Sequence, residues 1–376
     1  MHYFTYPMVS ALAASGVKVT LFSNDVLDKS EPPPANVTFE PAFRQIYGPQ
    51  PKWRRGLRYL AGLGRIGWQA FRRRPDTVHF HFNQIPMLDR LLFHWLKLWG
   101  ISVAISVHDI LPFAEGETAA DTTQAFQQLY RAADQLIAHS IYGREQLVQL
   151  VPDRAAHCHA VPQGHYLDLA DRNQLTRAAA RTCLGLPQAR PIVLIFGTLK
   201  PNKRLDIAFA ALEQLAAMLA TPPLFLVAGV AREYDVASAR QWLEARGLAD
   251  CVRWEDRYIQ PDEVPAFYQA ADVLLLPYAW IYQSATLVMA QSYGCPVVAT
   301  DVGSNGEYVR DGLTGRLTPL TADAIANTLA DLLNQPEKAT QMATAAKRHL
   351  RENLGWVEIA RQCLAIYQSA LPRRPL

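Results

Sequence analysis

Short apolar runs rich in β-branched residues alternate along the chain with segments whose apolar residues recur every three or four positions. The first pattern predicts strands and the second predicts helices. We predict strands at residues 17–23, 77–82, 102–107, 135–139, 192–196, 224–228, 252–254, 273–276 and 297–300. Several of these runs are apolar throughout, which is typical of parallel sheets covered by helices on both faces. The pattern therefore predicts an α/β protein.

The strand series restarts after a polar stretch at residues 164–190, where a new strand at 192–196 runs into a glycine. A restart of this kind indicates a second domain with its own sheet. We predict two doubly wound domains, residues 1–170 and 171–355, followed by a last helix in residues 356–376.

The beginning of the chain departs from this scheme. Residues 7–15 read as a helix, whereas a doubly wound domain normally opens with a strand. We expect the first domain to lack its first strand: either that strand is absent, or the true start lies upstream. In the second case the longer form would be the more stable protein, because its core would gain a central strand.

Composition excludes several classes of protein. Half of the 376 residues are hydrophobic, which excludes a disordered chain, and a formal net charge of +3 gives no whole-protein field for nucleic acid. The five cysteines lie far apart without a CxxC pair, which argues against a disulfide framework and a zinc site. No apolar run approaches the roughly 18 residues that span a bilayer, and no signal peptide opens the chain, so we expect a cytoplasmic protein.

Two strand-to-helix junctions in the second half carry groups that could bind an anion. The first runs from Gly197 through Lys200 and Lys203 into a helix predicted at residues 205–219. Cations at such a junction can meet a phosphate, and the free N–H groups of the helix N-terminus add donors. A solvated turn is the alternative interpretation.

The second junction is the start of a helix predicted at residues 285–293, preceded by Gln283 and Ser284. Ser284 is a good N-cap, and the N–H groups that follow it would face an anion; a capped structural helix is the alternative. Further on, Glu307 follows a glycine-rich turn. Its carboxylate could accept hydrogen bonds from a ribose, or it could be an ordinary surface glutamate.

Histidines mark the ends of predicted strands in the first half. His108 follows one of them, and ligands bind at the carboxyl ends of parallel strands, so His108 is a candidate partner for a substrate hydroxyl. We expect His79 and His81 to point to opposite faces of their strand, so that at most one of them is functional. The His-Cys-His triplet at 157–159 resembles metal ligands, but it has no partners at metal spacing, and we interpret it as structural.

Taken in chain order, these segments resemble family 4 glycosyltransferases, which have the GT-B fold. The second half carries the phrases FGTLKPNKRLDIAFAAL, ADVLLLPY, GCPVVATDVGSNGEYVRDGLTGRL and GWVEIA, and the first half agrees more loosely through HYFTYPMVSALAASGVKVTLFS, DTVHFHF, SVHDILP and ADQLIAHS. The resemblance implies two Rossmann-like domains that face each other across a cleft, with the acceptor side first and the nucleotide-sugar side second. It also implies a C-terminal helix that returns to the first domain.

The resemblance assigns roles to single positions. It gives His108 the catalytic position near the transferred sugar and places Lys203 against the donor diphosphate. The remaining donor-binding positions are Gly197, Lys200, Gln283, Ser284, Ala285, Thr286 and Glu307. The family transfers a sugar with retention of configuration and usually needs no metal ion, so no metal site and no cofactor beyond the donor are expected.

Some positions depart from the family's pattern. Ile281 and Met289 stand where a pair of glutamates is usual, and the second of those usually holds the ribose. Thr198 replaces an arginine for which Lys200 is close enough to substitute, and Arg204 replaces a glycine. The Gln-Ser phrase is similar to a branch of the family that lacks the first glutamate. A chain that has lost activity is the alternative.

We therefore expect a retaining, metal-independent hexosyltransferase that moves a sugar from a nucleotide diphosphate-sugar to a glycan or lipid-linked acceptor, in surface polysaccharide or glycoconjugate biosynthesis. A non-catalytic binding or partner protein with the same fold is the alternative. A sugar-nucleotide epimerase is a weaker one, because the order of the motifs argues against it.

A basic segment at residues 44–74 adds a possible partner. It holds nine basic residues and no acidic one, with Trp53, Tyr59, Trp68 and Phe71 interleaved. A basic amphipathic segment with aromatic residues suits an anionic membrane surface, and nothing else in the chain reads nucleic-acid bases. We expect peripheral attachment to the inner face of the cytoplasmic membrane, with the segment becoming helical on lipid because its glycines weaken the helix in water. A solvated loop that covers the first domain is the alternative.

Overall fold

The computed structural model describes residues 2–24, 34–44, 46, 50–111 and 118–371. The chain forms two compact units, of which one holds residues 1–164 and 355–376 and the other holds residues 165–354. The division thus falls at 164/165, where the sequence pattern suggested a boundary near residue 170.

The second unit, whose residues are all described, is built on a parallel sheet of six strands in the order β9-β8-β7-β10-β11-β12. The strands are β7 (Ile192–Phe196), β8 (Leu224–Ala228), β9 (Val252–Glu255), β10 (Val273–Leu276), β11 (Val297–Thr300) and β12 (Arg316–Thr318). This is the strand order 3-2-1-4-5-6 of doubly wound nucleotide-binding folds, in which the topology reverses between the first and fourth strands. The switch point therefore lies where β7 and β10 end.

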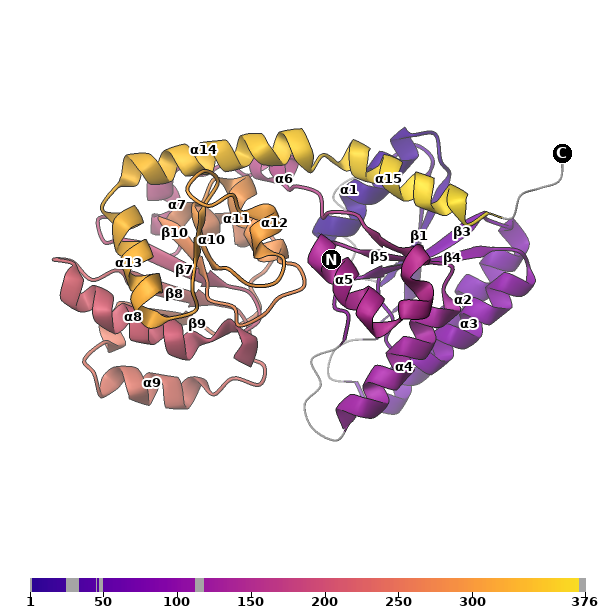
Figure 1. The fold of residues 1–376 in the computed structure, drawn as a ribbon, viewed down its shortest axis with the longest axis horizontal. Coiled ribbons are helices and arrows are strands. Elements are labelled where there is room, and N and C mark those ends of the chain that lie inside the picture. The colour runs from indigo at the N-terminus through magenta and orange to yellow at the C-terminus, as the bar shows by residue number, and fades with distance from the viewer. Residues whose placement is uncertain (1, 25–33, 45, 47–49, 112–117, 372–376) are drawn as a thin grey trace. The chain divides into compact units, whose positions relative to one another are not determined.

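Helices cover both faces of this sheet (Figure 1). They are α6 (Leu167–Arg172), α7 (Arg177–Cys183), α8 (Leu205–Met218), α9 (Val236–Glu244), α10 (Val264–Ala270), α11 (Ala285–Tyr293), α12 (Asn305–Tyr308), α13 (Ala322–Leu333) and α14 (Pro336–Asn353), with short 3-10 turns η2 (Pro201–Lys203) and η3 (Ala249–Cys251).

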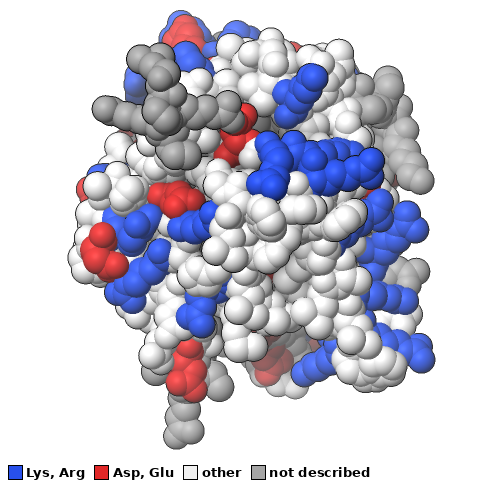
Figure 2. Space-filling view, turned by 90° about the vertical axis from the view of Figure 1, so that its right-hand side faces the viewer, with Lys and Arg blue, Asp and Glu red and all other residues white. Residues whose placement is uncertain are grey.

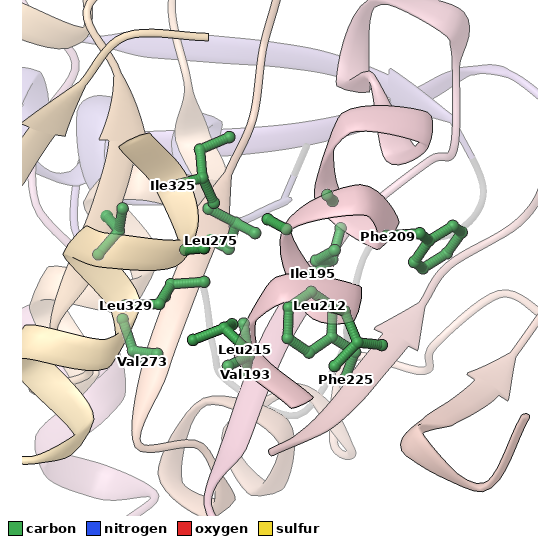
Figure 3. Packing of buried hydrophobic residues seen from close by; sticks show 14 of the residues in the cluster. Val193, Ile195, Phe209, Leu212, Leu215, Phe225, Val273, Leu275, Ile325 and Leu329 are labelled. Carbon is green, nitrogen blue, oxygen red and sulfur yellow. The ribbon is translucent and has the colours of Figure 1, made fainter. Parts of the chain in front are cut away.

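The core of the second unit explains the apolar strands. Ile195 of β7 and Leu275 of β10 point to one face, where they pack against side chains of α8 and α13 (Figure 3). Ile192 and Leu194 of β7 are equally buried although they point to the opposite face. Burial on both faces is the reason why these strands do not alternate between apolar and polar residues.

The first unit contains a parallel sheet with the order β3-β4-β5-β6 and, among the described residues, a separate parallel pair β1-β2. The strands are β1 (Val19–Asn24), β2 (Val37–Phe43), β3 (Thr77–Phe80), β4 (Ser102–Val107), β5 (Gln135–Ala138) and β6 (Cys158–Ala160). None of the described residues ahead of β1 lies in a strand; they form helix α1 (His2–Ala14) instead.

The other helices of this unit include the C-terminal one. They are α2 (Lys52–Arg73), α3 (Pro86–Leu98), α4 (Thr118–Ala132), α5 (Ile141–Leu150), the 3-10 helix η1 (Pro152–His157) and α15 (Trp356–Ser369). Helix α15 lies along α1 (Figure 1), where Trp356, Ile359 and Cys363 are buried against Met8 and Leu12. The predicted return of the last helix to the first domain is confirmed.

Helix α2 is continuous over its 22 residues although its sequence contains four glycines. Two of these glycines allow close packing: a Cβ atom on Gly62 would come within 2.5 Å of the Phe43 ring, and one on Gly67 within 3.3 Å of Leu92. Tertiary packing of one face therefore outweighs the low helix propensity of glycine. The expectation that lipid is needed to make this segment helical is wrong.

The sequence pattern did not predict three of the strands. Strands β6 and β12 have only three residues each, too few to show an alternating pattern. Strand β2 contains Pro41, a residue that argues against a strand in sequence-based prediction.

Candidate functional site

The topology reversal in the second unit brings the ends of two paired strands together. Strand β7 ends at Phe196 and runs into Gly197, and its neighbour β10 ends at Leu276 and runs towards Tyr278. In open α/β sheets, ligands bind outside the carboxyl ends of the strands at such a switch point. The glycine singled out from the sequence lies there.

Lys203 closes the turn η2 and directs its side chain back towards β7. Its Nζ donates a hydrogen bond to the carbonyl oxygen of Phe196 and lies 5.5 Å from the centroid of the Tyr278 ring. The residue is only 6% exposed, and burial lowers its pKa from 10.5 to about 7. No ion pair joins it to a carboxylate among the residues of the second unit, all of which are described. A bound anion would therefore stabilise the charged form of this lysine.

Two predicted donor-binding residues, Lys203 of η2 and Thr286 of α11, lie close to Gly197. A Cβ atom there would lie 3.4 Å from Nζ of Lys203 and 3.5 Å from Oγ1 of Thr286. The residue also has φ of +91°, a conformation that favours glycine. Behind it, a Cβ atom on Gly229 would lie 2.4 Å from the carbonyl oxygen of Gly197, so the two backbones pack directly on each other. Because Gly197 has no side chain, Nζ of Lys203 and Oγ1 of Thr286 can both lie close to the backbone at the end of β7.

Helix α11 begins where the sequence predicts. Ser284 is its N-cap, and the Ser284 Oγ accepts a hydrogen bond from the backbone N–H of Leu287 at 3.2 Å. The hydroxyl of Tyr278 interacts with the side chains of Ser284 and Thr286, although burial still raises the pKa of this tyrosine. Because the first N–H groups of a helix have no partner within it, the start of α11 offers hydrogen-bond donors and a positive dipole end on the same side as Thr286.

The glycine-rich turn lies against the segment that leads into α11. Gly303 has φ of +55°, and a Cβ atom on it would lie 1.9 Å from the carbonyl oxygen of Ile281. Three polar atoms of these two segments are buried without a hydrogen-bond partner among the described residues: Gln283 Nε2, Ser304 Oγ and Asn305 Oδ1. Buried polar atoms are normally paired, so these three lack hydrogen bonds that such atoms usually make.

Sequence reasoning identified Gln283 but missed Ser304 and Asn305, and it quoted Tyr278 only as part of a motif. Short polar residues in a turn are too common to stand out in a sequence. A tyrosine after a buried strand is equally ordinary until the fold places it beside the lysine.

The remaining predicted donor positions are less enclosed. Glu307 on α12 and Ala285 at the start of α11 are exposed, and Lys200 is half-buried directly before η2. Arg204, which replaces the family's glycine, has φ of +42° and pairs with Asp206 at 2.7 Å. The left-handed backbone explains why glycine is usual at this position.

In the first unit, histidines line the carboxyl ends of three neighbouring strands. His81, His108 and His139 follow directly after β3, β4 and β5. The ring centroid of His108 lies 5.9 Å from that of His81 and 4.6 Å from that of His139. His139 was missed, although it ends a predicted strand just as His108 does.

The expectation that His79 and His81 point to opposite faces is wrong. Their ring centroids are 4.3 Å apart, because residues two apart along a strand lie on the same face. His79 is held by two hydroxyls: the Tyr367 hydroxyl lies 2.6 Å from Nδ1 and the Ser106 hydroxyl 3.0 Å from Nε2.

Burial makes the whole histidine cluster reluctant to take up a proton. It lowers the pKa of His79 and His108 and brings the pKa of His81 to about 3 and that of His139 to about 4. The Nδ1 of His139 donates to the carbonyl oxygen of Val161 at 3.1 Å. At neutral pH these rings are neutral hydrogen-bonding groups and not cations.

No group of three or more His, Cys, Asp or Glu side chains that could hold a metal ion occurs among the described residues. In the triplet at 157–159, Cys158 is a buried residue of β6, and His159 bonds Gln135 at 2.7 Å. The five cysteines are all free. The structural interpretation of this triplet therefore agrees with its contacts.

Comparison with known proteins matches both units. Residues 2–169 match the family model "Glycosyltransferase Family 4", and residues 177–349 match "Glycosyl transferases group 1". The D-inositol 3-phosphate glycosyltransferase of Streptomyces scabiei is 31% identical over 79% of this chain and 68% of its own length. That of Thermomonospora curvata is 29% identical over 98% of this chain and 90% of its own length.

Solved structures agree in fold. HepE of Anabaena in complex with UDP-glucose superposes with a TM-score of 0.74 at 18% identity, covering 98% of this chain and 96% of its own. Sucrose-phosphate synthase of Thermosynechococcus elongatus gives a TM-score of 0.72 at 20% identity, covering 96% and 91%. The predicted α/β architecture of GT-B type is confirmed, and the chain belongs to the family 4 glycosyltransferases.

Proposed function

We propose that this protein is a retaining, metal-independent hexosyltransferase that transfers a sugar from a nucleotide diphosphate-sugar to a glycan or lipid-linked acceptor. The observation that carries the proposal is the convergence of Lys203, Thr286 and the N-terminus of α11 around Gly197 at the switch point. In this proposal, these groups bind the donor diphosphate without a metal ion. The HepE structures with UDP and UDP-glucose support a uridine diphosphate-sugar as the first donor to test.

In this proposal the diphosphate leaves with its charge spread over Lys203 and the helix N-terminus. Such interactions accelerate transfer when they strengthen as the sugar–phosphate bond breaks. Gln283, which is half-buried and whose Nε2 has no hydrogen-bond partner among the described residues, would bond the donor beside Lys203 and Thr286. His108 would bond a sugar hydroxyl as a neutral ring, which its lowered pKa favours.

The acceptor has two candidates. The basic segment favours an acceptor carried by a lipid, in surface polysaccharide or glycoconjugate biosynthesis. The names of the relatives favour a phosphorylated polyol such as inositol 3-phosphate. A direct assay separates the two candidates.

The outer face of the first unit supports a membrane partner. On α2 the exposed apolar side chains Trp53, Leu57, Leu60 and Trp68 recur at helical spacing, and the two tryptophans are each 63% exposed. The neighbouring helix α3 adds a second exposed row, Met87, Leu91 and Leu98. In Figure 2, basic side chains gather beside uncharged surface along the right-hand edge of the view.

We propose that this face attaches reversibly to anionic lipid on the cytoplasmic side of the membrane. Each cation near such a surface contributes ~1 kcal/mol, and the apolar rows would enter the interface. Two of the arginines, Arg65 and Arg73, are partly engaged with Glu40. None of the described helices is long and apolar enough to span a bilayer.

The test is a transfer assay with purified protein. UDP-, GDP- and ADP-sugars are offered with inositol 3-phosphate or with a lipid-linked glycan, with and without EDTA, and NMR reports the anomeric configuration of the product. His108→Ala should lower kcat more than donor affinity. A protein that binds donors but neither transfers nor hydrolyses them would be the non-catalytic alternative.

A further inference from the structure

A second pocket lies in the second unit, at the opposite end of its sheet from the switch point. It has a volume of about 330 Å³, which falls in the range of small-molecule sites. Its lining includes Pro191, Asp272 and Pro296, which directly precede β7, β10 and β11. The proposed donor site, around Gly197 and Lys203, lies beyond the carboxyl ends of β7 and β10. One ligand of this size therefore cannot occupy both places.

Three cations and one carboxylate line this pocket: Arg177, Arg181, Lys347 and Asp272. Arg181 is buried and fully engaged, since it donates to the carbonyl oxygen of Ala270 at 3.0 Å and to Asp272 at 2.7 Å. Asp272 also pairs with Arg177 at 3.0 Å. The carboxylate is therefore neutralised by two guanidinium groups, and the charge that remains is positive.

Lys347 adds a second positive charge to the one that the two arginines leave beside Asp272. No hydrogen bond or ion pair joins it to another residue of the second unit, all of which is described. Its stem packs on the end of α11, where a Cβ atom on Gly294 would lie 2.9 Å from the Lys347 Cε. The lining also includes apolar side chains, among them Leu332 and Leu333 at the end of α13 and Ala343 one turn before Lys347 on α14.

We propose that this pocket binds a small organic phosphate such as a sugar phosphate, with its anionic head at Lys347 and the exposed part of Arg177 and its carbon skeleton against the end of α13 and the face of α14. A charged head needs the cations, and an apolar wall favours a carbon skeleton over a bare inorganic ion. Ligand binding would tie α7, α11 and α14 together, away from the chemistry at the switch point.

The experiment is isothermal titration of the full chain with glucose 6-phosphate, glucose and inorganic phosphate. We expect saturable binding of the sugar phosphate, weaker binding of inorganic phosphate and none of glucose. Lys347→Met should weaken sugar phosphate binding about 10- to 100-fold, because it removes a charge-assisted hydrogen bond while keeping the stem on Gly294. Lys338→Met is the matched control on the same helix and should leave binding unchanged.

Competition with UDP and a second variant distinguish this pocket from the donor site. UDP should not displace the sugar phosphate, and Lys203→Met should not weaken its binding. Lack of saturable binding by the wild-type chain, displacement by UDP, or equal affinity in Lys347→Met with an unchanged melting temperature would each overturn the proposal. These results are independent of whether the protein transfers a sugar.

Discussion

The hydroxyl of Tyr367, on the C-terminal helix α15, lies 2.6 Å from Nδ1 of His79 on strand β3. These two residues are 288 positions apart in the chain. The contact ties the last helix to the histidine cluster that contains His108. Tyr367 therefore contacts the cluster directly, in addition to its place in the hydrophobic contact between α15 and α1.

Removing this hydroxyl tests that role. Tyr367→Phe should lower the free energy of unfolding by ~1–2 kcal/mol, because a buried histidine nitrogen loses its partner. Denaturant unfolding measures the change, and Tyr258→Phe, at a residue that is 64% exposed, is the control. Equal stability of the two variants would show that the hydroxyl contributes nothing.

The pKa of Lys203 predicts proton uptake on donor binding. With a pKa of about 7 the lysine is largely neutral at pH 8, and a bound diphosphate would raise its pKa and charge it. Calorimetry of UDP binding at pH 8 in buffers of different ionisation enthalpy should show uptake of up to one proton. Lys203→Met should lose this uptake and bind UDP about 10- to 100-fold more weakly, since one charge-assisted contact is gone. Uptake that persists in the variant would assign the proton to another group.

The same lysine also affects stability in a defined pH window. Its folded pKa lies below its unfolded value of 10.5, so the unfolded chain binds the extra proton between about pH 7 and 10.5. Through this group alone, stability rises with pH across that window and is constant below it. Lys203→Met should flatten this part of the curve.

Acid should destabilise the first unit through its histidines. The pKa of His139 is about 4 in the folded protein against 6.5 unfolded, so the unfolded chain takes up the proton first as the pH falls. Stability is therefore lost between about pH 6.5 and 4. His139→Gln should reduce the slope of the unfolding free energy against pH in this window, by up to the amount that the binding of one proton contributes. An unchanged slope would mean that His139 does not titrate there.

Gly303 should tolerate no side chain. Gly303→Ala would bring a Cβ atom to 1.9 Å from the Ile281 carbonyl oxygen, so the turn has to move away from the segment before α11. We expect weaker donor binding and a lower melting temperature, measured by titration and calorimetry. Gly312→Ala is the matched control, because it also has positive φ but no atom within 4 Å of its Cβ position. Donor affinity that falls equally in both variants would contradict the packing argument.

Membrane attachment should depend on the exposed rows of α2 and α3. Co-sedimentation with vesicles containing anionic lipid should be strong at low salt and weaker at high salt, because exposed charges are screened. The double variant Trp53→Ser and Trp68→Ser should lose most of it, since these side chains are available to enter the interface. Val357→Ser with Leu313→Ser removes exposed apolar groups elsewhere and should bind like the parent. No sedimentation of the parent at low salt would end the proposal.

Five of the six strands of the second unit, β7 to β11, were predictable because its core is simple. Buried strands such as β7 and β10 are apolar on both faces, and Ser284 and Gly294 cap α11 as short-range rules predict. The approximate positions of Gly197 and Lys203 follow from the same local patterns. These features depend on neighbours along the chain, so local sequence patterns were enough to predict them.

Other features depend on contacts between segments that are distant in the sequence, and these contacts form only when the chain folds. The burial of Lys203, and hence its lowered pKa, requires Tyr278 from another loop to cover it. His139 joins His108 only because β4 and β5 are neighbours in the sheet. Helix α2 persists through its glycines because Phe43 and Leu92 pack where a side chain would otherwise stand. Sequence patterns report local propensity, whereas burial and the proximity of charged groups arise only when the chain is packed.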